Sequence, residues 1–450
     1  MLQSPSRIFH RNLNAHLPVA QASAGVYISD KQGNRYLDAC GGAAVSCLGH
    51  GHPRVIESIK HQLDTMAYAH SGFFTSETSE QLAQFLAQRA PENIEHVYFL
   101  SGGSEAVEAA LKMARQYFLE LGQPSKQKFI ARRQSYHGNT LGALSVSGNR
   151  WRRQQFEPML MDVELISPCY AYRDQLEGET ERDYGLRVAN ELESKIAEMG
   201  SENVIGFIAE PVVGATSGAL VPVPGYFKRI REICDRHNIL LILDEVMCGM
   251  GRTGSLFACE LEGVRPDIIT IAKGLAAGYQ PIGATLCSSQ IYSQFRDGSG
   301  AFQHGHTYVG HATACAAALA VQQTIEDENL LENVSHMGEV INMALHERFG
   351  EHPFVGDIRG RGLFRALELV ADRNTKAPLP HQLSMAAEIK RQGMAQGLAC
   401  YPNSGTIDGL HGDHILLAPP YIIEQSHVEQ IVDKLGLAVD AALNAKGITV

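Results

Sequence analysis

The chain has 450 residues, of which 44% are hydrophobic and 19% charged, a length typical of roughly two or three structural lobes around an extensive core. Its 49 acidic residues outnumber its 38 basic ones, giving a formal net charge of -11, and the charges are scattered rather than clustered. This pattern disfavours nucleic-acid binding and a polybasic membrane-binding surface.

The cysteines and the N-terminal segment predict a cytoplasmic protein. The nine cysteines are odd in number, include no C-x-x-C pair and lie mostly among apolar residues, as expected of reduced thiols. No apolar run approaches the roughly 18 to 20 residues of a membrane span. Residues 1–29 contain Arg7 and Arg11 but no acid, which is also compatible with a mitochondrial transit segment, although an ordinary N-terminal arm is our preferred interpretation.

Strand-like and helix-like segments alternate from about residue 95 to residue 330, which predicts an α/β fold with a mainly parallel sheet and helices on both faces. The first unit is a strand at 96–100, the loop sequence SGGS and a helix that begins at Ser104, with apolar residues three or four positions apart. The segments 1–60 and 340–450 lack this alternation. We therefore expect the two chain ends to form a smaller α+β lobe.

The later predicted strands end close to residues that can do chemistry. Strand 128–133 precedes Tyr136 and His137, strand 204–212 contains Glu210, the helix 226–238 leads into strand 239–246 with Asp244, and the run beginning at Asp267 ends at Lys273. In an open α/β sheet, ligands bind beyond the carboxyl ends of the strands. We therefore expect the SGGS loop, Glu210, Asp244 and Lys273 to lie close together.

Two of these side chains carry charges next to apolar strands. Asp244 follows four apolar residues and Lys273 follows a β-branched run, so each charge incurs a desolvation cost unless it is paired or chemically consumed. A direct salt bridge between them would satisfy both. The SGGS loop offers backbone N–H groups and hydroxyls at the positive end of a helix dipole, which indicates an anion site, with plain capping by Ser104 as the alternative. It lacks the lysine and the spacing of a nucleotide P-loop.

A phosphate anchor, a buried carboxylate and a lysine after a strand together match the requirements of pyridoxal 5'-phosphate (PLP). The amine of Lys273 would condense with the cofactor's aldehyde, which removes the charge, and Asp244 would keep the pyridine nitrogen protonated. The small residues that follow Lys273 would leave room for the cofactor. Tyr136 could place an aromatic face against the ring; otherwise it is a half-buried aromatic residue.

Several segments resemble those of class III, fold type I, PLP-dependent aminotransferases, and the resemblance covers about residues 25 to 425 in uninterrupted order. The most specific segments are FLSGGSEAVEAALKMAR, SYHGNTLGALSVSG, LILDEVMCGMGRTGS, PDIITIAKGLAAGYQPIGA and HGHTYVGHATACAAALAV. The resemblance implies a large PLP-binding domain at 61–335 with a mainly parallel seven-stranded sheet flanked by helices, plus a small α+β domain made from 1–60 and 336–450. It also implies a homodimer, with a tetramer as an alternative.

The same resemblance assigns roles to residues by their position in these segments. Lys273 and Asp244 would be the catalytic residues, and no metal ligand is implied. The implied cofactor-binding residues are Gly103, Ser104, Tyr136, His137, Glu210, Asp244, Val246, Lys273 and Thr307. Within this set, Gly103 and Ser104 would bind the phosphate, and Thr307 would reach the phosphate of the neighbouring subunit. Tyr136 would stack on one face of the ring, Val246 would pack on the opposite face, and Glu210 would lie near the ring hydroxyl or the substrate.

The substrates are less strongly indicated. Relatives that accept α-carboxylates often carry an arginine shortly before the C-terminal PP segment, whereas residues 406–422 contain no arginine and have Leu410 and His411 in that neighbourhood. The apolar pocket candidates are Phe73, Phe74 and Tyr421. They favour an ω-amine or amino acid donor and pyruvate as the 2-oxo acid acceptor, in a ping-pong mechanism. The alternatives within PLP chemistry are a 2-oxoglutarate-dependent aminotransferase of GABA, ornithine or diamine type, an aminomutase and a decarboxylase.

Three other classes of protein are weaker interpretations. GMGRTG at 249–254 matches the dinucleotide pattern G-x-G-x-x-G, but DEVMC separates it from the strand and no clear amphipathic helix follows, which disfavours an NAD-dependent oxidoreductase. The histidine clusters at 50–52 and 304–311 invite a zinc site, but there is no H-E-x-x-H motif and glycines intervene. A non-catalytic PLP-binding module would require a lost lysine or an attached DNA-binding domain, and the sequence shows neither.

Overall fold

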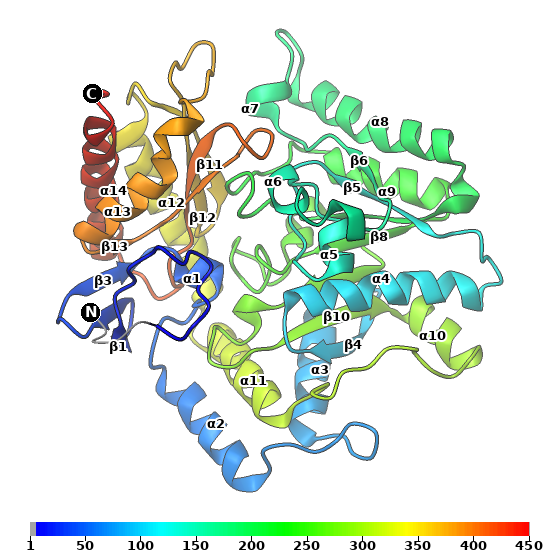
Figure 1. The fold of residues 1–450 in the computed structure, drawn as a ribbon. Coiled ribbons are helices and arrows are strands. Elements are labelled where there is room, and N and C mark those ends of the chain that lie inside the picture. Colours follow the sequence, from blue (N-terminus) through cyan, green and yellow to red (C-terminus); the bar gives the residue numbers. More distant parts are fainter. Residues whose placement is uncertain (1–5, 450) are drawn as a thin grey trace.

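The computed structural model describes residues 6–449, which form a larger and a smaller lobe side by side (Figure 1). A seven-stranded sheet with strand order β4-β10-β9-β8-β7-β5-β6 lies at the centre of the larger lobe. Its strands are β4 (Ile94–Leu100), β5 (Lys128–Arg132), β6 (Glu164–Ile166), β7 (Val204–Ala209), β8 (Leu240–Asp244), β9 (Ile268–Ile271) and β10 (Gly283–Ser288). Strands β5 to β9 pair in parallel, and β10 pairs antiparallel with β9 and β4. The predicted mainly parallel seven-stranded sheet is confirmed.

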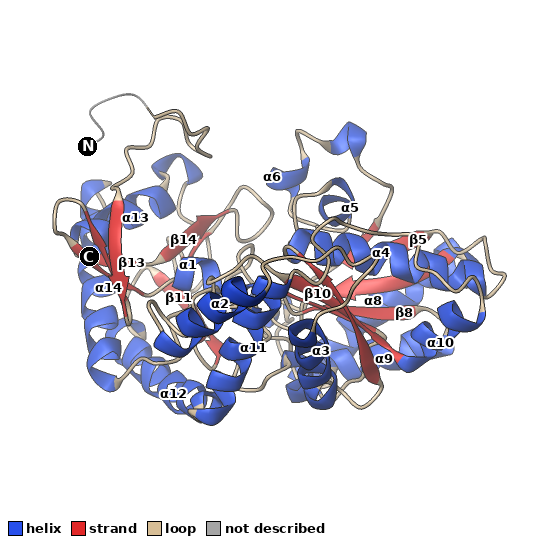
Figure 2. Cartoon of the chain, turned by 90° about the horizontal axis from the view of Figure 1, so that it is seen from below, coloured by secondary structure: helices blue, strands red, loops and turns tan. Residues whose placement is uncertain are grey.

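Helices cover both faces of this sheet, as a parallel sheet requires (Figure 2). The helices of this part of the chain are α2 (Pro53–Thr65), α3 (Glu77–Arg89), α4 (Gly103–Glu120), α5 (Leu141–Ser145), α6 (Arg150–Arg153), α7 (Ala171–Asp174), α8 (Glu181–Met199), α9 (Tyr226–Arg236), α10 (Ser289–Asp297) and α11 (Ala312–Asp327). Single 3-10 turns occur at Glu157–Met159, Ser201–Asn203, Ala258–Glu262 and Lys273–Leu275. The last of these turns follows β9 and contains the predicted catalytic lysine.

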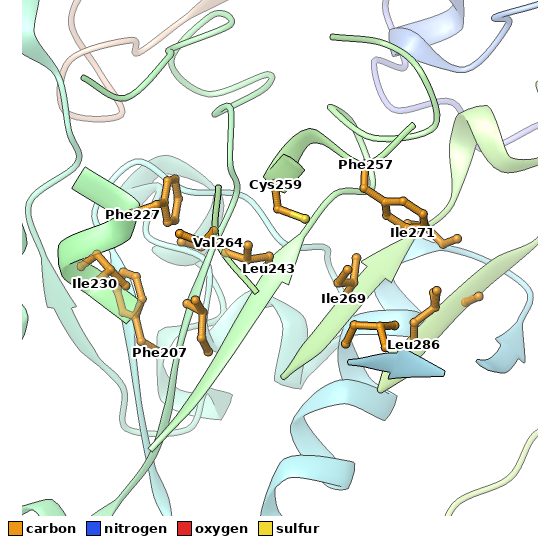
Figure 3. Close-up of a cluster of buried hydrophobic side chains, with 14 of the residues drawn as sticks. Phe207, Phe227, Ile230, Leu243, Phe257, Cys259, Val264, Ile269, Ile271 and Leu286 are labelled. Carbon is orange, nitrogen blue, oxygen red and sulfur yellow. The ribbon is translucent and has the colours of Figure 1, made fainter. Parts of the chain in front are cut away.

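The central strands are almost entirely apolar because both of their faces are buried; the exceptions in β8 and β9 are Asp244 and Thr270. Phe207 and Leu243 point to one face, where they meet Phe227 and Ile230 of α9 (Figure 3). The next residues along the strands, among them Ile208, point to the other face and pack against α4. This two-residue alternation inside continuous apolar runs fixes the sheet rigidly between two helical layers and so positions the loops at its carboxyl edge.

The smaller lobe combines both ends of the chain. One four-stranded sheet has the order β1-β2-β3-β13 and the other β11-β12-β15-β14. The strands are β1 (Ala20–Ala24), β2 (Tyr27–Asp30), β3 (Arg35–Asp38), β11 (Val355–Arg361), β12 (Phe364–Leu369), β13 (Leu398–Ala399), β14 (Tyr401–Ser404) and β15 (Asp413–Leu417). The helices are α1 (Gly41–Ala44), α12 (Leu330–Phe349), α13 (Met385–Ala395) and α14 (Gln425–Ala445), with a 3-10 turn at His381–Leu383. The parallel pairing of β13 with β3 joins the two chain ends, while the exact domain boundaries remain a prediction.

A buried charge cluster connects the two lobes. Glu368 on β12 lies 2.6 Å from the guanidinium of Arg359 on β11 and 2.5 Å from that of Arg173 on α7. The hydroxyl of Tyr170 donates a hydrogen bond to the same carboxylate. Because Glu368 is fully buried, this cluster holds the lobes in one relative position.

Two further observations concern the expected cellular environment. Within residues 6–449, all nine cysteines are free and all but Cys40 are buried. None of the helices in this described part of the chain has the length and apolar character needed to cross a membrane.

Candidate active site

A cavity of about 580 Å³ lies at the carboxyl edge of the central strands. Its walls come from the loops that follow β4, β5, β7, β8 and β9, and from Ala43, Val45 and Tyr401 of the smaller lobe. Of the sequence-predicted residues, it brings together Gly103, Ser104, Tyr136, His137, Glu210, Asp244, Val246 and Lys273. The predicted proximity of these strand-end residues is therefore observed, while their role in binding a ligand stays a prediction.

Asp244 is the last residue of β8, and its carboxylate is held by several donors. Oδ2 lies 2.6 Å from Nδ1 of His137, and Oδ1 accepts hydrogen bonds from the backbone N–H of Val246 at 3.0 Å and the hydroxyl of Thr270 at 3.2 Å. The His137 backbone N–H in turn donates to the hydroxyl of Ser147 at 2.8 Å. Asp244 and His137 are both 3% exposed, so the carboxylate is desolvated and fixed in orientation. No pattern in the sequence predicted the contact between these two residues.

Lys273 follows β9 and adopts a left-handed backbone conformation, with φ of 45°. Such a conformation is strained for a residue with a side chain, and it directs the chain sharply away from the strand. Nζ donates a hydrogen bond to the backbone oxygen of Ala43 at 3.3 Å. Within residues 6–449, Lys273 forms no ion pair, so the alternative of a direct salt bridge with Asp244 is wrong. Burial lowers the pKa of Lys273 to about 8, although Asp244 and Glu210 favour its charged form.

The N-terminus of α4 forms the third element of the site. The helix begins at Gly103, so Ser104 lies inside it and the alternative that Ser104 caps the helix is wrong. The N-cap residue is Gly102, which has no side chain to satisfy the first N–H groups. A Cβ atom on Gly103 would lie 2.8 Å from Cγ1 of Val246, so only glycine lets this turn approach the β8 loop so closely. The hydroxyl of Ser104 accepts a hydrogen bond from the backbone N–H of Asn139 at 3.2 Å.

Glu210 and Tyr136 lie on adjoining walls of the cavity. The carboxylate of Glu210 accepts hydrogen bonds from the backbone N–H groups of Tyr136 at 3.3 Å and Gly214 at 3.1 Å. Burial raises the pKa of Glu210, while the nearby His137 opposes this shift. Tyr136 is half-buried. Both side chains are held by the same loop that places His137 against Asp244.

Four residues that the sequence analysis assigned to the site do not line this cavity in their own chain. Tyr421 is buried in the core of the smaller lobe, where its hydroxyl donates to the backbone oxygen of Met250 at 2.9 Å. The assignment of Tyr421 to the pocket is therefore wrong. Phe73 and Phe74 are 83% and 67% exposed and do not line the cavity of their own chain. Thr307 is exposed and also lies outside the cavity of its own chain, and its role at a neighbouring subunit remains a prediction.

The cavity also contains cationic residues that the sequence did not single out. Arg152 on α6 and Arg11 of the N-terminal arm line it, together with Tyr401 of β14. Arg152 belongs to the segment RWRR, which has no periodic pattern and only four helical residues. No signal in the sequence distinguished it from an ordinary surface arginine.

The sheet, its helical layers and the lysine and aspartate at its carboxyl edge define a fold type I transaminase architecture. The chain matches the family model described as Aminotransferase class-III over residues 8–439, and it belongs to that family. The family uses PLP.

Individual relatives agree with this membership. An uncharacterized aminotransferase of Schizosaccharomyces pombe is 43% identical over 97% of this chain and 96% of its own length. Gamma aminobutyrate transaminase 3 of Solanum lycopersicum, a chloroplastic protein, is 36% identical over 94% of this chain and 80% of its own length. The solved structure of the omega transaminase from Pseudomonas jessenii in complex with PMP has a TM-score of 0.90 and 34% identity, covering 96% of this chain and 94% of that one.

Proposed function

We propose that this class III aminotransferase moves an amino group from an ω-amine or amino acid to a 2-oxo acid, with pyruvate as the favoured acceptor. The observation that carries the proposal is a desolvated lysine, with a pKa of about 8, facing the same cavity as a buried Asp244–His137 pair. The omega transaminase among the structural relatives supports an ω-amine donor. The gamma aminobutyrate transaminase among the sequence relatives supports a GABA-type donor with 2-oxoglutarate as the alternative.

The residues of the cavity fit PLP. Its volume of about 580 Å³ suits a small aromatic phosphate, since ligand pockets typically measure roughly 300 to 1,000 Å³. The uncapped N-terminus of α4 supplies N–H donors for a phosphate, and Gly103 keeps that turn free of side-chain obstruction. His137 has a buried Nε2 atom without a partner within the described chain. The predicted roles of Gly103, Ser104, Tyr136, Val246 and Glu210 as further cofactor contacts are part of the proposal.

When bound, PLP supplies an electron sink that stabilises negative charge on the substrate carbon. Asp244 would face the ring nitrogen with a fixed negative charge, because His137 and two further donors orient its oxygens. Lys273 would remove a proton from the substrate carbon and return it, since a pKa of about 8 leaves part of its Nζ population neutral near physiological pH. Val246 and the buried walls of the cavity would exclude water during these transfers.

The proposal includes a homodimer, with a tetramer as the alternative, in which Thr307 contacts the phosphate bound to the neighbouring subunit. Thr307 is exposed on a loop whose position is fixed by a hydrogen bond from the Tyr68 hydroxyl to the Thr307 backbone oxygen at 2.7 Å. Phe73, Phe74 and Tyr308 add exposed aromatic surface, which is typical of interfaces. The free cysteines support a cytoplasmic location.

The proposed function is tested by a matrix of donors and acceptors with the purified enzyme. Steady-state rates with ω-amines and pyruvate should give parallel lines in double-reciprocal plots, the pattern of a ping-pong mechanism. Exclusive use of 2-oxoglutarate would favour the GABA-type alternative, and release of carbon dioxide without amino transfer would contradict the proposal. Light scattering distinguishes monomer, dimer and tetramer, and a Thr307→Val variant should bind PLP more weakly.

A further inference from the structure

The cavity contains two arginine side chains that have no anionic partner among the described residues. Within residues 6–449, neither Arg152 nor Arg11 forms an ion pair, and neither guanidinium donates a hydrogen bond. Arg152 is half-buried, whereas Arg11 is exposed. A partly desolvated guanidinium without a counter-ion, facing a cavity, attracts an anionic ligand.

Arg152 lies against the aromatic ring that the proposed cofactor site requires. Its guanidinium carbon is 4.5 Å from the centroid of the Tyr136 ring, within the range of a cation–π interaction. Stacking on a ring uses the face of the guanidinium and leaves the N–H groups at its edge free to donate. The charge of Arg152 also contributes to the lowered pKa of Lys273. Arg152 therefore lies near both proposed functional residues.

Tyr401 of the smaller lobe lies near Arg152 at the cavity wall. Burial raises the pKa of Tyr401, while Arg152 and Arg11 oppose this shift by favouring the phenolate. The two guanidinium groups and the Tyr401 hydroxyl thus share one polar part of the cavity wall. This part offers several hydrogen-bond donors, and the two carboxylates that line the same cavity, Glu210 and Asp244, already accept hydrogen bonds from backbone N–H groups.

The helix that carries Arg152 is held from both lobes. The Asn149 side chain accepts a hydrogen bond from the Arg152 backbone N–H at 3.3 Å and donates one to Oε1 of Gln134 at 3.3 Å. Gln134 donates to the backbone oxygens of Gly405 and Thr406 at 2.7 and 3.0 Å. Figure 1 shows the loop after β14 reaching toward α6, and the backbone there is so close that a Cβ on Gly409 would lie 3.0 Å from the Trp151 nitrogen. Arg152 is therefore presented by a fixed element.

The loop after β14 does not itself supply the missing cation. His411 lies 2.7 Å from the carboxylate of Asp408, and it does not line the cavity. Residues 406–422 contain no arginine. The loop instead packs on the helix that carries Arg152, and Arg152 lines the cavity.

We propose that Arg152 binds the carboxylate of the 2-oxo acid acceptor and of amino acid donors through paired N–H donors at its guanidinium edge. This inference rests on the proposed function, because it assigns the specificity of the same cavity. It predicts that substrates with a carboxylate depend on Arg152, whereas simple amines depend on it far less.

The test compares probes with and without a carboxylate on the holoenzyme. Isopropylamine reports the first half-reaction without a carboxylate, pyruvate reports the second, and propionate, which cannot react, is titrated by calorimetry. Arg152→Leu should raise the KM for pyruvate and the Kd for propionate by about 10- to 100-fold, the size of a lost charged hydrogen-bond pair. The effect on isopropylamine should be at least about tenfold smaller. Arg152→Lys should fall between wild type and Arg152→Leu.

Arg150→Leu is the matched control, since Arg150 lies on the same helix but outside this cavity, and it should change neither constant. The inference is overturned if Arg152→Leu leaves propionate binding unchanged, if it weakens isopropylamine and pyruvate equally, or if Arg11→Leu alone produces the carboxylate effect. If the wild-type enzyme accepts no amine, the proposed function fails, and the propionate titration still decides whether Arg152 is a carboxylate site.

Discussion

Replacing Lys273 by methionine should stabilise the PLP-free protein at neutral pH. Burial lowers the pKa of this lysine from an ordinary 10.5 to about 8, and such a difference corresponds to about 3 kcal/mol of folding free energy. The methionine side chain is similar in length to that of lysine and carries no charge, and both residues have the same strain energy in the left-handed backbone conformation. At pH 7 the variant should therefore have a free energy of unfolding about 3 kcal/mol higher than that of the wild type.

The sign of the pH dependence follows from the two pKa values. The unfolded lysine keeps its proton up to about pH 10.5, whereas the folded one releases it near pH 8, so the penalty is complete below pH 8 and disappears between these two values. The advantage of Lys273→Met should thus fall to about 2 kcal/mol at pH 9. PLP-free wild type and variant would be compared by urea denaturation at pH 7 and pH 9.

The exposed Lys228 on α9 provides a matched control, because Lys228→Met should change the stability by less than about 0.5 kcal/mol at both pH values. A Lys273→Met variant that is no more stable than wild type at pH 7 would refute the reasoning. The reasoning would also be refuted if the stability difference between Lys273→Met and wild type grew from pH 7 to pH 9, because this would mean that the lysine is not desolvated in the folded protein.

Three further changes test other parts of the structure. Glu368→Ala should lower the free energy of unfolding by about 3 to 5 kcal/mol in chemical denaturation, because it removes the only ion-pair partner of Arg173 within the described residues and one of the two carboxylates that pair with Arg359, the other being Asp357. A loss below about 1 kcal/mol would contradict the inter-lobe charge cluster. Gly103→Ala should lower the free energy of unfolding by about 1 to 3 kcal/mol and weaken PLP binding, because the new Cβ would lie 2.8 Å from Cγ1 of Val246. Gly102→Ala is the control: its Cβ would meet nothing within 4 Å, so it should lower the stability in thermal unfolding far less. Asp244→Asn should lower kcat/KM by about 100-fold or more with PLP retained at saturation, and activity within tenfold of wild type would contradict a charge requirement at the ring nitrogen.

The sequence predicted the centre of the fold because buried parallel strands have a distinctive composition. The runs that became β7, β8 and β9 are apolar except for Thr270 and the terminal Asp244, and turn residues bound them clearly. Their ends were less accurate: the predicted strand 204–212 ends at Ala209, and α4 begins one residue earlier than expected. The antiparallel direction of β10 was not predicted, because strand direction depends on the path of the connecting chain and not on composition.

The site was predicted to the extent that it follows from strand ends. Asp244 and Lys273 line one cavity, as predicted, because the carboxyl ends of neighbouring buried strands meet at the same edge of an α/β sheet. Arg152 was missed because its position depends on contacts of a four-residue helix with a distant loop, which leave no periodic pattern. Tyr421 was misplaced for a related reason: an aromatic residue in an apolar segment has the same local pattern whether it lines a pocket or packs in a core.

Reduction of the freshly purified active enzyme with borohydride, followed by peptide mass mapping, tests the central claim most directly. The account predicts that the reduced cofactor is found on the peptide that contains Lys273, at a stoichiometry matching the PLP content of the protein. Fully active enzyme whose Lys273 peptide carries no modification, or whose cofactor is attached to a different lysine, would contradict it.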